Sequence, residues 1–335
     1  GADGFRMDVI SLLAKDPQLP DGTGSGYMFS PEYFAFQPRL HDYLREMRRE
    51  CFDGRDCMCV GETSFVTTQN AGSVVDDGRE LDMLFQFDVM DMDGGETKWD
   101  ARPFDLMRFK QIISAWQAAI GWNTLFWGNH DQPRLVSRFG CTRTETLRRR
   151  SATCLATAMY LLRGTPFLYQ GEEIGMTNWR PERADMYEDV QTRYTYAHTA
   201  LKQSEEVRLH RLWRSSRDSA RTPVQWDSSE NAGFTTGKPW FYVNQNYKDI
   251  NVAKQEADPD SVLNFYRKAV ALRKSLSCVR YGEYREYNKL SGKHYLYSMD
   301  DGQQKILVVC SFAKKNTPFR APKGFRPEDG ELILC

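Results

Sequence analysis

The 335-residue sequence predicts an α/β fold in which helices cover a parallel sheet, followed by a small antiparallel β domain. Three observations favour this fold class. Short apolar runs that end in polar residues recur along the first half of the chain, and amphipathic helical patterns fill the gaps between them. From Val279 onward, short alternating segments are separated by turn residues, which is typical of antiparallel strands.

Five apolar runs are expected to form the parallel strands. Their spacing of roughly 25 to 55 residues suits βα units that carry insertions. Because a parallel barrel or open sheet collects its loops at the carboxyl ends of the strands, residues at those ends are candidates for chemistry. The runs span residues 3–10, 57–62, 81–89, 123–131 and 165–175.

Amphipathic patterns predict helices over residues 105–117, 144–163 and 261–276. Thr144 is placed to cap the amino end of the second helix. The sequence Gly-Thr-Pro that begins at Gly164 is expected to end it.

The segment 177–260 is rich in Arg, Asp, Asn, Pro and Gly, and predicts long ordered loops with short helices. We therefore expect a first domain over residues 1–276 that includes this excursion after its last strand. A β domain over residues 277–335 follows, and its last strands are expected to lie beyond the given sequence.

Composition and charge exclude several classes of partner. Lysine plus arginine equal aspartate plus glutamate at 45 each, so no net field favours nucleic acid or an anionic membrane. The 13% aromatic content suits sugar faces as well as protein cores, and core packing is the default interpretation. No apolar run approaches the ~18 residues of a membrane span. We expect a cytoplasmic monomer that binds a small neutral substrate.

The eight cysteines do not form the dense, evenly spaced set of a disulfide scaffold, so reduced and mostly buried thiols are expected. A metal site formed by Cys51, Cys57 and Cys59 is an alternative. The segment CMCVGE is more typical of a buried strand, and no fourth ligand stands at zinc spacing. We therefore predict no metal site in this chain.

Three of the five expected strands end in an acidic residue: Asp8, Glu62 and Asp131. Carboxylates that share one rim repel each other and raise at least one pKa, which is costly unless they have a function. Each has a structural alternative. Asp8 can cap a helix that begins near Ser11, Glu62 can be a solvated loop residue, and Asp131 can form a turn before Pro133.

Retaining cleavage of a glycosidic bond requires two carboxyls ~5 Å apart, one acting as a nucleophile and the other as an acid. Asp8 and Glu62 have sequence surroundings that suit these two different roles. Arg6 precedes Asp8 by two residues and can hold it ionised. Glu62 has no cation near it in sequence, so burial can raise its pKa. His130 supplies hydrogen bonds for sugar hydroxyls, and Arg134 either anchors the group or forms a surface salt bridge.

The motifs GADGFRMDVI, VGET, WGNHDQPR and GTPFLYQGEEIGM, in this order, resemble the α-amylase superfamily of retaining glycoside hydrolases. Within it, the chain is similar to the oligo-1,6-glucosidase and α-glucosidase group. The stretch 216–240 is similar to the signature that follows the eighth strand in that group. The likeness covers nearly the whole sequence.

This resemblance implies a retaining exo-α-glucosidase that acts on α-1,6 bonds of small oligosaccharides and needs no cofactor. It implies Asp8 as the nucleophile, Glu62 as the general acid/base and Asp131 as the carboxylate that stabilises the transition state. In this group a valine after the nucleophile goes with α-1,6 preference and a threonine with α-1,4. The residues implied in substrate binding are Arg6, Val9, His130, Arg221 and Arg134.

The resemblance also implies a (β/α)8 TIM barrel, of which the sequence holds strands 4–8 with their helices. The first three strands and a calcium-binding loop would precede Gly1, so we expect the given segment alone to be inactive. One departure is Gly128, where relatives commonly carry asparagine.

Other functions of related proteins stay open. Trehalose-6-phosphate hydrolase and the sucrose-isomerising transglycosylases share these motifs, although the isomerases carry a charged loop that residues 96–105 do not match. A noncatalytic relative, such as the ectodomain of a transporter heavy chain, keeps the fold but typically loses the catalytic carboxylates. All three carboxylates are present here.

Overall fold

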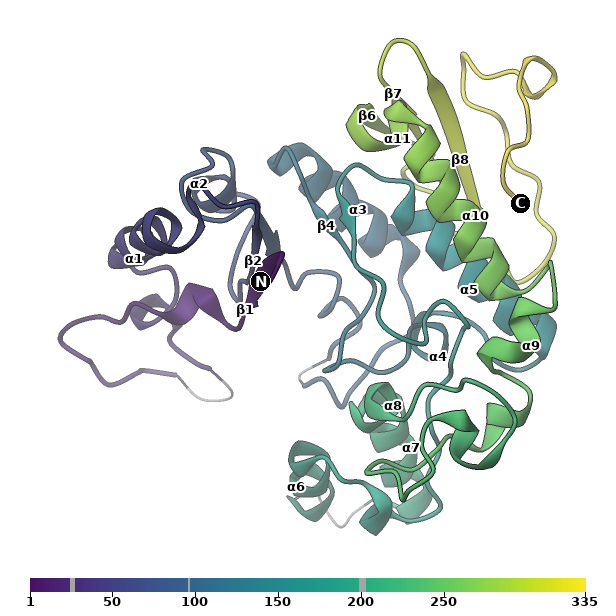
Figure 1. Cartoon of the computed structure of the whole chain (residues 1–335), viewed down its shortest axis with the longest axis horizontal. Coiled ribbons are helices and arrows are strands. Elements are labelled where there is room, and N and C mark those ends of the chain that lie inside the picture. The colour runs from purple at the N-terminus through teal and green to yellow at the C-terminus, as the bar shows by residue number, and fades with distance from the viewer. Residues whose placement is uncertain (25–27, 96, 199–202) are drawn as a thin grey trace. The chain divides into compact units, whose positions relative to one another are not determined.

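The computed structural model describes residues 1–24, 28–95, 97–198 and 203–335 (Figure 1). Contacts group the chain into two compact units. The first unit comprises Gly1–Met90, Gln111–Thr124 and Arg163–Thr165, and the second comprises Asp91–Lys110, Leu125–Leu162 and Pro166–Cys335.

The first unit holds a parallel sheet in the order β1 (Gly4–Met7), β2 (Met58–Glu62) and β3 (Met83–Phe85). The predicted parallel strands are confirmed here, with shorter bounds than the apolar runs. Gly61 is needed in β2, because a Cβ atom at this position would lie 2.6 Å from Ile10 Cγ2 and 2.7 Å from a methyl carbon of Leu81. The close packing of these side chains therefore places a glycine directly before Glu62.

The core of the first unit is built by α1 (Arg39–Met47), which buries Leu40 and Leu44, and by the second half of α3 (Leu106–Ala119). The predicted apolar face of α3 is confirmed, since Leu106, Phe109, Ile113 and Trp116 are buried. Shorter segments complete this unit: η1 (Ile10–Leu12), η2 (Pro31–Tyr33), η3 (Arg48–Phe52) and α2 (Gly72–Val75).

The strands β4 (Thr124–Leu125) and β5 (Thr165–Pro166) form a two-stranded sheet. Both are much shorter than the runs predicted at 123–131 and 165–175. Near the end of the first run, the Asn129 side chain accepts the backbone N–H of Asp131 at 2.8 Å and forms a turn, so the strand does not continue to residue 131. In β5, the proline allows only a brief pairing.

Two long helices of the second unit, α5 (Glu145–Tyr160) and α10 (Val262–Ser275), confirm the predicted helices at 144–163 and 261–276. The predicted cap is also confirmed, because the Thr144 hydroxyl accepts the N–H of Leu147 at 3.2 Å. Arg273 of α10 donates to the carbonyl of Tyr160 at 3.0 Å and so ties the two helices together.

A three-stranded antiparallel sheet follows α10, as predicted (Figure 1). Its strands are β6 (Glu283–Tyr287), β7 (His294–Asp300) and β8 (Lys305–Ser311). Val279, the predicted start of the strand region, lies instead in the short helix α11 (Ser277–Tyr281), where it is fully buried.

Short helices occupy residues 177–260 of the second unit: α6 (Val190–His198), α7 (Glu205–Ser215), α8 (Asp218–Arg221), α9 (Val252–Glu256), η4 (Ala184–Met186), η5 (Glu230–Gly233) and η6 (Gln245–Lys248). The helix α4 (Leu135–Phe139) and the turn η7 (Pro327–Asp329) complete the elements. No helix in the described part of the chain has the length and apolar character needed to cross a membrane.

The eight cysteines are free thiols, as expected, but only Cys59, Cys278 and Cys310 are buried. Cys59 lies inside β2, which favours the strand interpretation of its segment over the metal one. Across the four described ranges, no three His, Cys, Asp or Glu side chains are grouped so as to hold a metal ion.

Candidate active site

The sequence-predicted residues fall into two groups, one in each unit. In the first unit, Asp8 directly follows β1 and Glu62 is the last residue of β2. The guanidinium of Arg6 contacts both: Nη1 pairs with Asp8 Oδ1, and Nη2 lies 2.8 Å from Glu62 Oε2. The parallel register, in which Arg6 faces Val60, brings the two strand ends to the same edge. One cation therefore bridges two carboxylates.

The two carboxylates differ in their exposure to solvent. The Asp8 side chain is 73% exposed, whereas that of Glu62 is 10% exposed. Burial raises the pKa of Glu62, and the neighbouring Asp8 carboxylate adds to the rise, while the Val9 N–H and Arg6 oppose it. The contact between Arg6 and Glu62 was not predicted from the sequence, because it joins residues of different strands.

Val9, which directly follows Asp8, has an unusual backbone conformation. Its φ of 38° and ψ of 40° are left-handed, which is strained for a β-branched residue. The conformation aims its N–H at Glu62 Oε2, at 3.1 Å. Val9 also occupies the N-cap position of η1 without any side-chain cap, so the alternative in which Asp8 caps this helix is wrong. The solvated-loop alternative for Glu62 is also wrong.

In the second unit, Asp131 is held by cations at the two ends of α8. Arg217 Nη1 and Arg221 Nη2 each lie 2.8 Å from Asp131 Oδ1, and His130 Nε2 lies 3.4 Å from Oδ2. Arg221 also donates from Nε to the backbone carbonyl of His130 at 3.1 Å. The structure thus brings together three residues singled out from the sequence, and adds Arg217.

Asp189 and Lys98 complete this cluster and were missed in the sequence. Arg217 Nε donates to Asp189 Oδ1 at 2.6 Å. Burial acts to raise the pKa of Asp189, but hydrogen bonds from Arg217 and Thr192 outweigh it and lower that pKa. The Lys98 ammonium lies in the field of Asp189, Arg217 and Asp131, and desolvation lowers its pKa to about 8. No local pattern marks either residue, because both reach the cluster from distant loops.

Arg134 lies outside this cluster. It is buried, and its guanidinium donates to the carbonyls of Ser219, Gln170 and Thr222 at 2.8, 2.5 and 3.2 Å. The surface salt-bridge alternative is therefore wrong. Two of these carbonyls belong to α8 and the residue that follows it, so Arg134 positions the segment that carries Arg221.

Gly128, the departure from relatives, stands in open space: a Cβ atom there would meet nothing within 4 Å. The glycine is not required by packing. A Cβ atom has room at this position, so no packing constraint found at the Cβ explains why a glycine stands where relatives commonly carry a polar side chain.

Chemically, the first unit offers an exposed carboxylate paired with arginine beside a buried carboxyl of raised pKa. The exposed carboxylate, Asp8, suits an ionised nucleophile, and the buried carboxyl, Glu62, suits a proton donor near neutral pH. The second unit offers a carboxylate oriented by two arginines and a histidine.

Comparisons with known proteins give a consistent family. The model of the alpha amylase catalytic domain matches residues 1–282. The oligo-1,6-glucosidase of Bacillus cereus is 41% identical over 343 residues, which cover 100% of this chain and 61% of that protein. The chain therefore spans about three fifths of the length of this curated relative.

Solved structures agree with this result. A variant of the trehalose-6-phosphate hydrolase of Bacillus licheniformis superposes with a TM-score of 0.91 at 39% identity, over 98% of this chain and 60% of that one. The isomaltulose synthase SmuA from Protaminobacter rubrum gives a TM-score of 0.89 at 35% identity, over 96% of this chain and 59% of that one.

Proposed function

The chain belongs to the α-amylase catalytic-domain family, and we propose that it is the larger part of a retaining exo-α-glucosidase that hydrolyses α-1,6 bonds of isomalto-oligosaccharides. The observation that carries this proposal is the bridge from Arg6 to Asp8 and Glu62. It pairs one exposed carboxylate with one buried carboxyl of raised pKa, as double displacement requires.

In the first step, an Asp8 oxygen attacks the anomeric carbon while Glu62 donates its proton to the leaving glycosidic oxygen. The Arg6 guanidinium keeps Asp8 ionised. After Glu62 has given up its proton, its carboxylate is stabilised by Arg6 Nη2 at 2.8 Å and by the Val9 N–H at 3.1 Å. In the second step, Glu62 takes a proton from water, which attacks the glucosyl ester and releases glucose with retained configuration.

We assign Asp131 to stabilise the distorted, positively charged sugar of the transition state. Its orientation by Arg217 and Arg221 supports this role, because both donors lie 2.8 Å from the same oxygen and leave Oδ2 to His130. His130, with half of its side chain exposed, is assigned to sugar hydroxyls. Arg134 is assigned a positioning role rather than the substrate contact expected from the sequence.

The finer features of the fold are also proposals. We infer that β1 to β5 are the fourth to eighth strands of the (β/α)8 barrel that the family implies. Covalent catalysis by two carboxylates needs no cofactor, so we propose none for the reaction. A monomer and a cytoplasmic location remain expectations.

Trapping with a 5-fluoro-α-glucosyl fluoride tests the mechanism. With the full-length protein, the label is expected on the peptide that contains Asp8, because only the nucleophile forms the glucosyl ester. Mass spectrometry after proteolysis locates it. A label on the peptide of Glu62 or Asp131, or on no peptide despite turnover, would refute the assignment.

Val9→Thr tests the linkage preference. The substitution preserves β-branching, and hence the cost of the left-handed backbone, but exchanges a methyl for a hydroxyl. We expect the ratio of kcat/KM for isomaltose over maltose to fall roughly tenfold. Val9→Ile is the matched control and should retain the parental ratio. An unchanged ratio in Val9→Thr would remove Val9 from the specificity argument.

A second candidate is trehalose-6-phosphate hydrolysis, which the 0.91 TM-score to such an enzyme favours. Sucrose isomerisation is a third, given the similarity to isomaltulose synthase. Comparing kcat/KM on isomaltose, trehalose 6-phosphate and sucrose with one preparation separates the three. The α-1,6 proposal requires isomaltose to be the preferred substrate by at least roughly tenfold.

A further inference from the structure

We propose that the pocket lined by Trp99, Tyr196, Leu212 and Arg208 binds one sugar ring of an oligosaccharide, outside the cleavage site. This outer pocket lies wholly in the second unit, between the loop at 97–100 and the helices α6 and α7. Its volume of about 210 Å³ is below the ~300–1,000 Å³ of sites for drug-sized ligands, so it suits a single ring.

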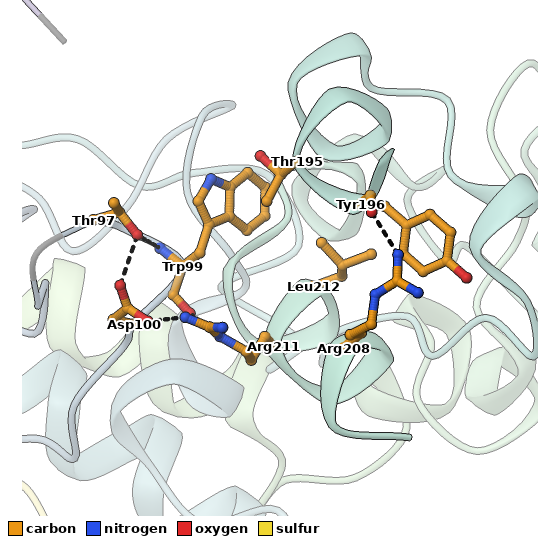
Figure 2. Close-up of a pocket in the computed structure, with 8 residues that line it drawn as sticks. All are labelled: Thr97, Trp99, Asp100, Thr195, Tyr196, Arg208, Arg211 and Leu212. Atoms are coloured by element: carbon orange, nitrogen blue, oxygen red, sulfur yellow. Dashed lines mark hydrogen bonds and ion pairs between the residues drawn. The ribbon is translucent and has the colours of Figure 1, made fainter. Parts of the chain in front are cut away.

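Three residues, Trp99, Tyr196 and Leu212, give the outer pocket its apolar walls. Figure 2 shows Leu212 between Trp99 and Tyr196, which come from different segments of the chain. Leu212 is buried in a cluster with Trp179 and Tyr187, and Trp99 and Tyr196 pack against that cluster. The aromatic residues are thus held in place by the core. Rigid aromatic surfaces suit the C–H faces of a pyranose ring.

Arg208, a lining residue of the outer pocket, has one donor without a partner among the described residues. Arg208 stacks over the Tyr196 ring at 3.9 Å, and its Nη2 donates to the backbone carbonyl of Tyr196 at 2.6 Å. Its Nε is buried, and no hydrogen-bond acceptor for it is found among the described residues. A buried N–H without an acceptor is costly. A ligand hydroxyl oxygen would satisfy it.

The charges favour a neutral ligand over an anion. The Arg211 guanidinium pairs with Asp100, and Arg208 Nη1 lies 3.4 Å from Glu205 Oε2. The Thr97 hydroxyl donates to the remaining oxygen of Asp100 at 2.9 Å. Two cations and two anions therefore cancel in these two pairs, so among the described side chains neither arginine is left as an uncompensated charge for a phosphate.

Lys98 lies beside Trp99, a lining residue of the outer pocket, and interacts with the charges of the Asp131 cluster. Lys98 Nζ lies 4.7 Å from the centre of the Trp99 ring, and the charge of Lys98 interacts with Asp189 and Asp131. We infer that an oligosaccharide held near Asp131 places a further ring on Trp99. This inference rests on the proposed glycosidase function, because it takes the ligand to be an oligosaccharide.

The test compares long and short substrates in the full-length protein. We expect Trp99→Ala to raise KM for isomaltotetraose roughly tenfold, since loss of a stacked ring removes contacts of that order. KM and kcat for 4-nitrophenyl α-glucoside should stay within about twofold of the parental values, because this substrate has one sugar. Trp99→Phe should restore most of the loss, and Trp240→Ala, at an exposed tryptophan that does not line this pocket, should have no effect.

A direct titration separates this inference from the catalytic one. Isomaltotetraose is titrated calorimetrically into Asp8→Asn and into Asp8→Asn/Trp99→Ala, where no turnover is needed. Weaker binding only in the double variant supports the outer pocket even if the protein hydrolyses another linkage. Equal affinities, an equal KM increase for both substrates, or displacement of the sugar by inorganic phosphate would overturn it. Arg208→Lys, which removes the Nε donor but keeps the charge, should also weaken binding.

Discussion

Asp8→Asn in the full-length protein is expected to lower kcat for isomaltose by about 10⁴-fold or more, because an amide cannot form the glucosyl ester. The effect should be larger on kcat than on KM, since Asp8 acts on the transition state. Initial rates of glucose release measure it. The Arg6 guanidinium would then face one carboxyl instead of two, so Glu62 should titrate at a lower pH in the variant.

Two controls make this prediction specific. Asp21→Asn, at an exposed aspartate, should keep parental rates. In Asp8→Asn and its alanine counterpart, added azide can replace the missing nucleophile, and the glucosyl azide formed should have inverted configuration. Activity within tenfold of the parent, or an azide product of retained configuration, would contradict the nucleophile assignment.

The free energy of unfolding is expected to fall by up to about 3 kcal/mol as the pH rises from about 4.5 to about 7, because of one buried carboxyl. Glu172 is buried, and burial raises its pKa to about 7, against hydrogen bonds from the hydroxyls of Tyr160 and Tyr266 at 2.5 and 2.9 Å. In this window the unfolded chain has lost the proton that the folded chain keeps. Stability from a raised pKa is therefore present at low pH and lost as pH rises through 7.

Glu172→Gln removes this dependence, since the amide is neutral at every pH and its oxygen can still accept from the tyrosines. The variant should gain up to about 3 kcal/mol relative to the parent between pH 5 and 8. Urea denaturation at a series of pH values measures the difference. Glu230→Gln, at an exposed glutamate, is the control and should parallel the parent. Parallel curves for Glu172→Gln and the parent would show that Glu172 does not titrate in this range.

Local patterns were sufficient for several features of the fold. The apolar face of α3, the cap formed by Thr144 and the strands β7 and β8 were predicted because each depends on residues within one turn or one strand. The pairing of Arg6 with Asp8 was also predicted, because two residues on an extended segment share a side. Strand lengths were overestimated, since apolar runs continue past the point where turns begin.

Motif order by itself also determined the family, which the match over residues 1–282 confirms. It marked Asp8, Glu62 and Asp131 as candidates before any contact was known. The assignment of these residues to catalytic roles is still a prediction, to be tested by the label and the variants described above.

Only the tertiary structure decided how each carboxylate is held. The second contact of Arg6, to Glu62, depends on the parallel register of β1 and β2, and Gly61 permits the close approach of Ile10 and Leu81 directly before Glu62. The arginines on Asp131 come from about 90 residues away along the chain. Arg134, which was predicted to contact substrate, is buried and donates hydrogen bonds to backbone carbonyls. Sequence spacing reports neighbours within one element, whereas burial and pKa arise from residues that folding brings together from distant parts of the chain.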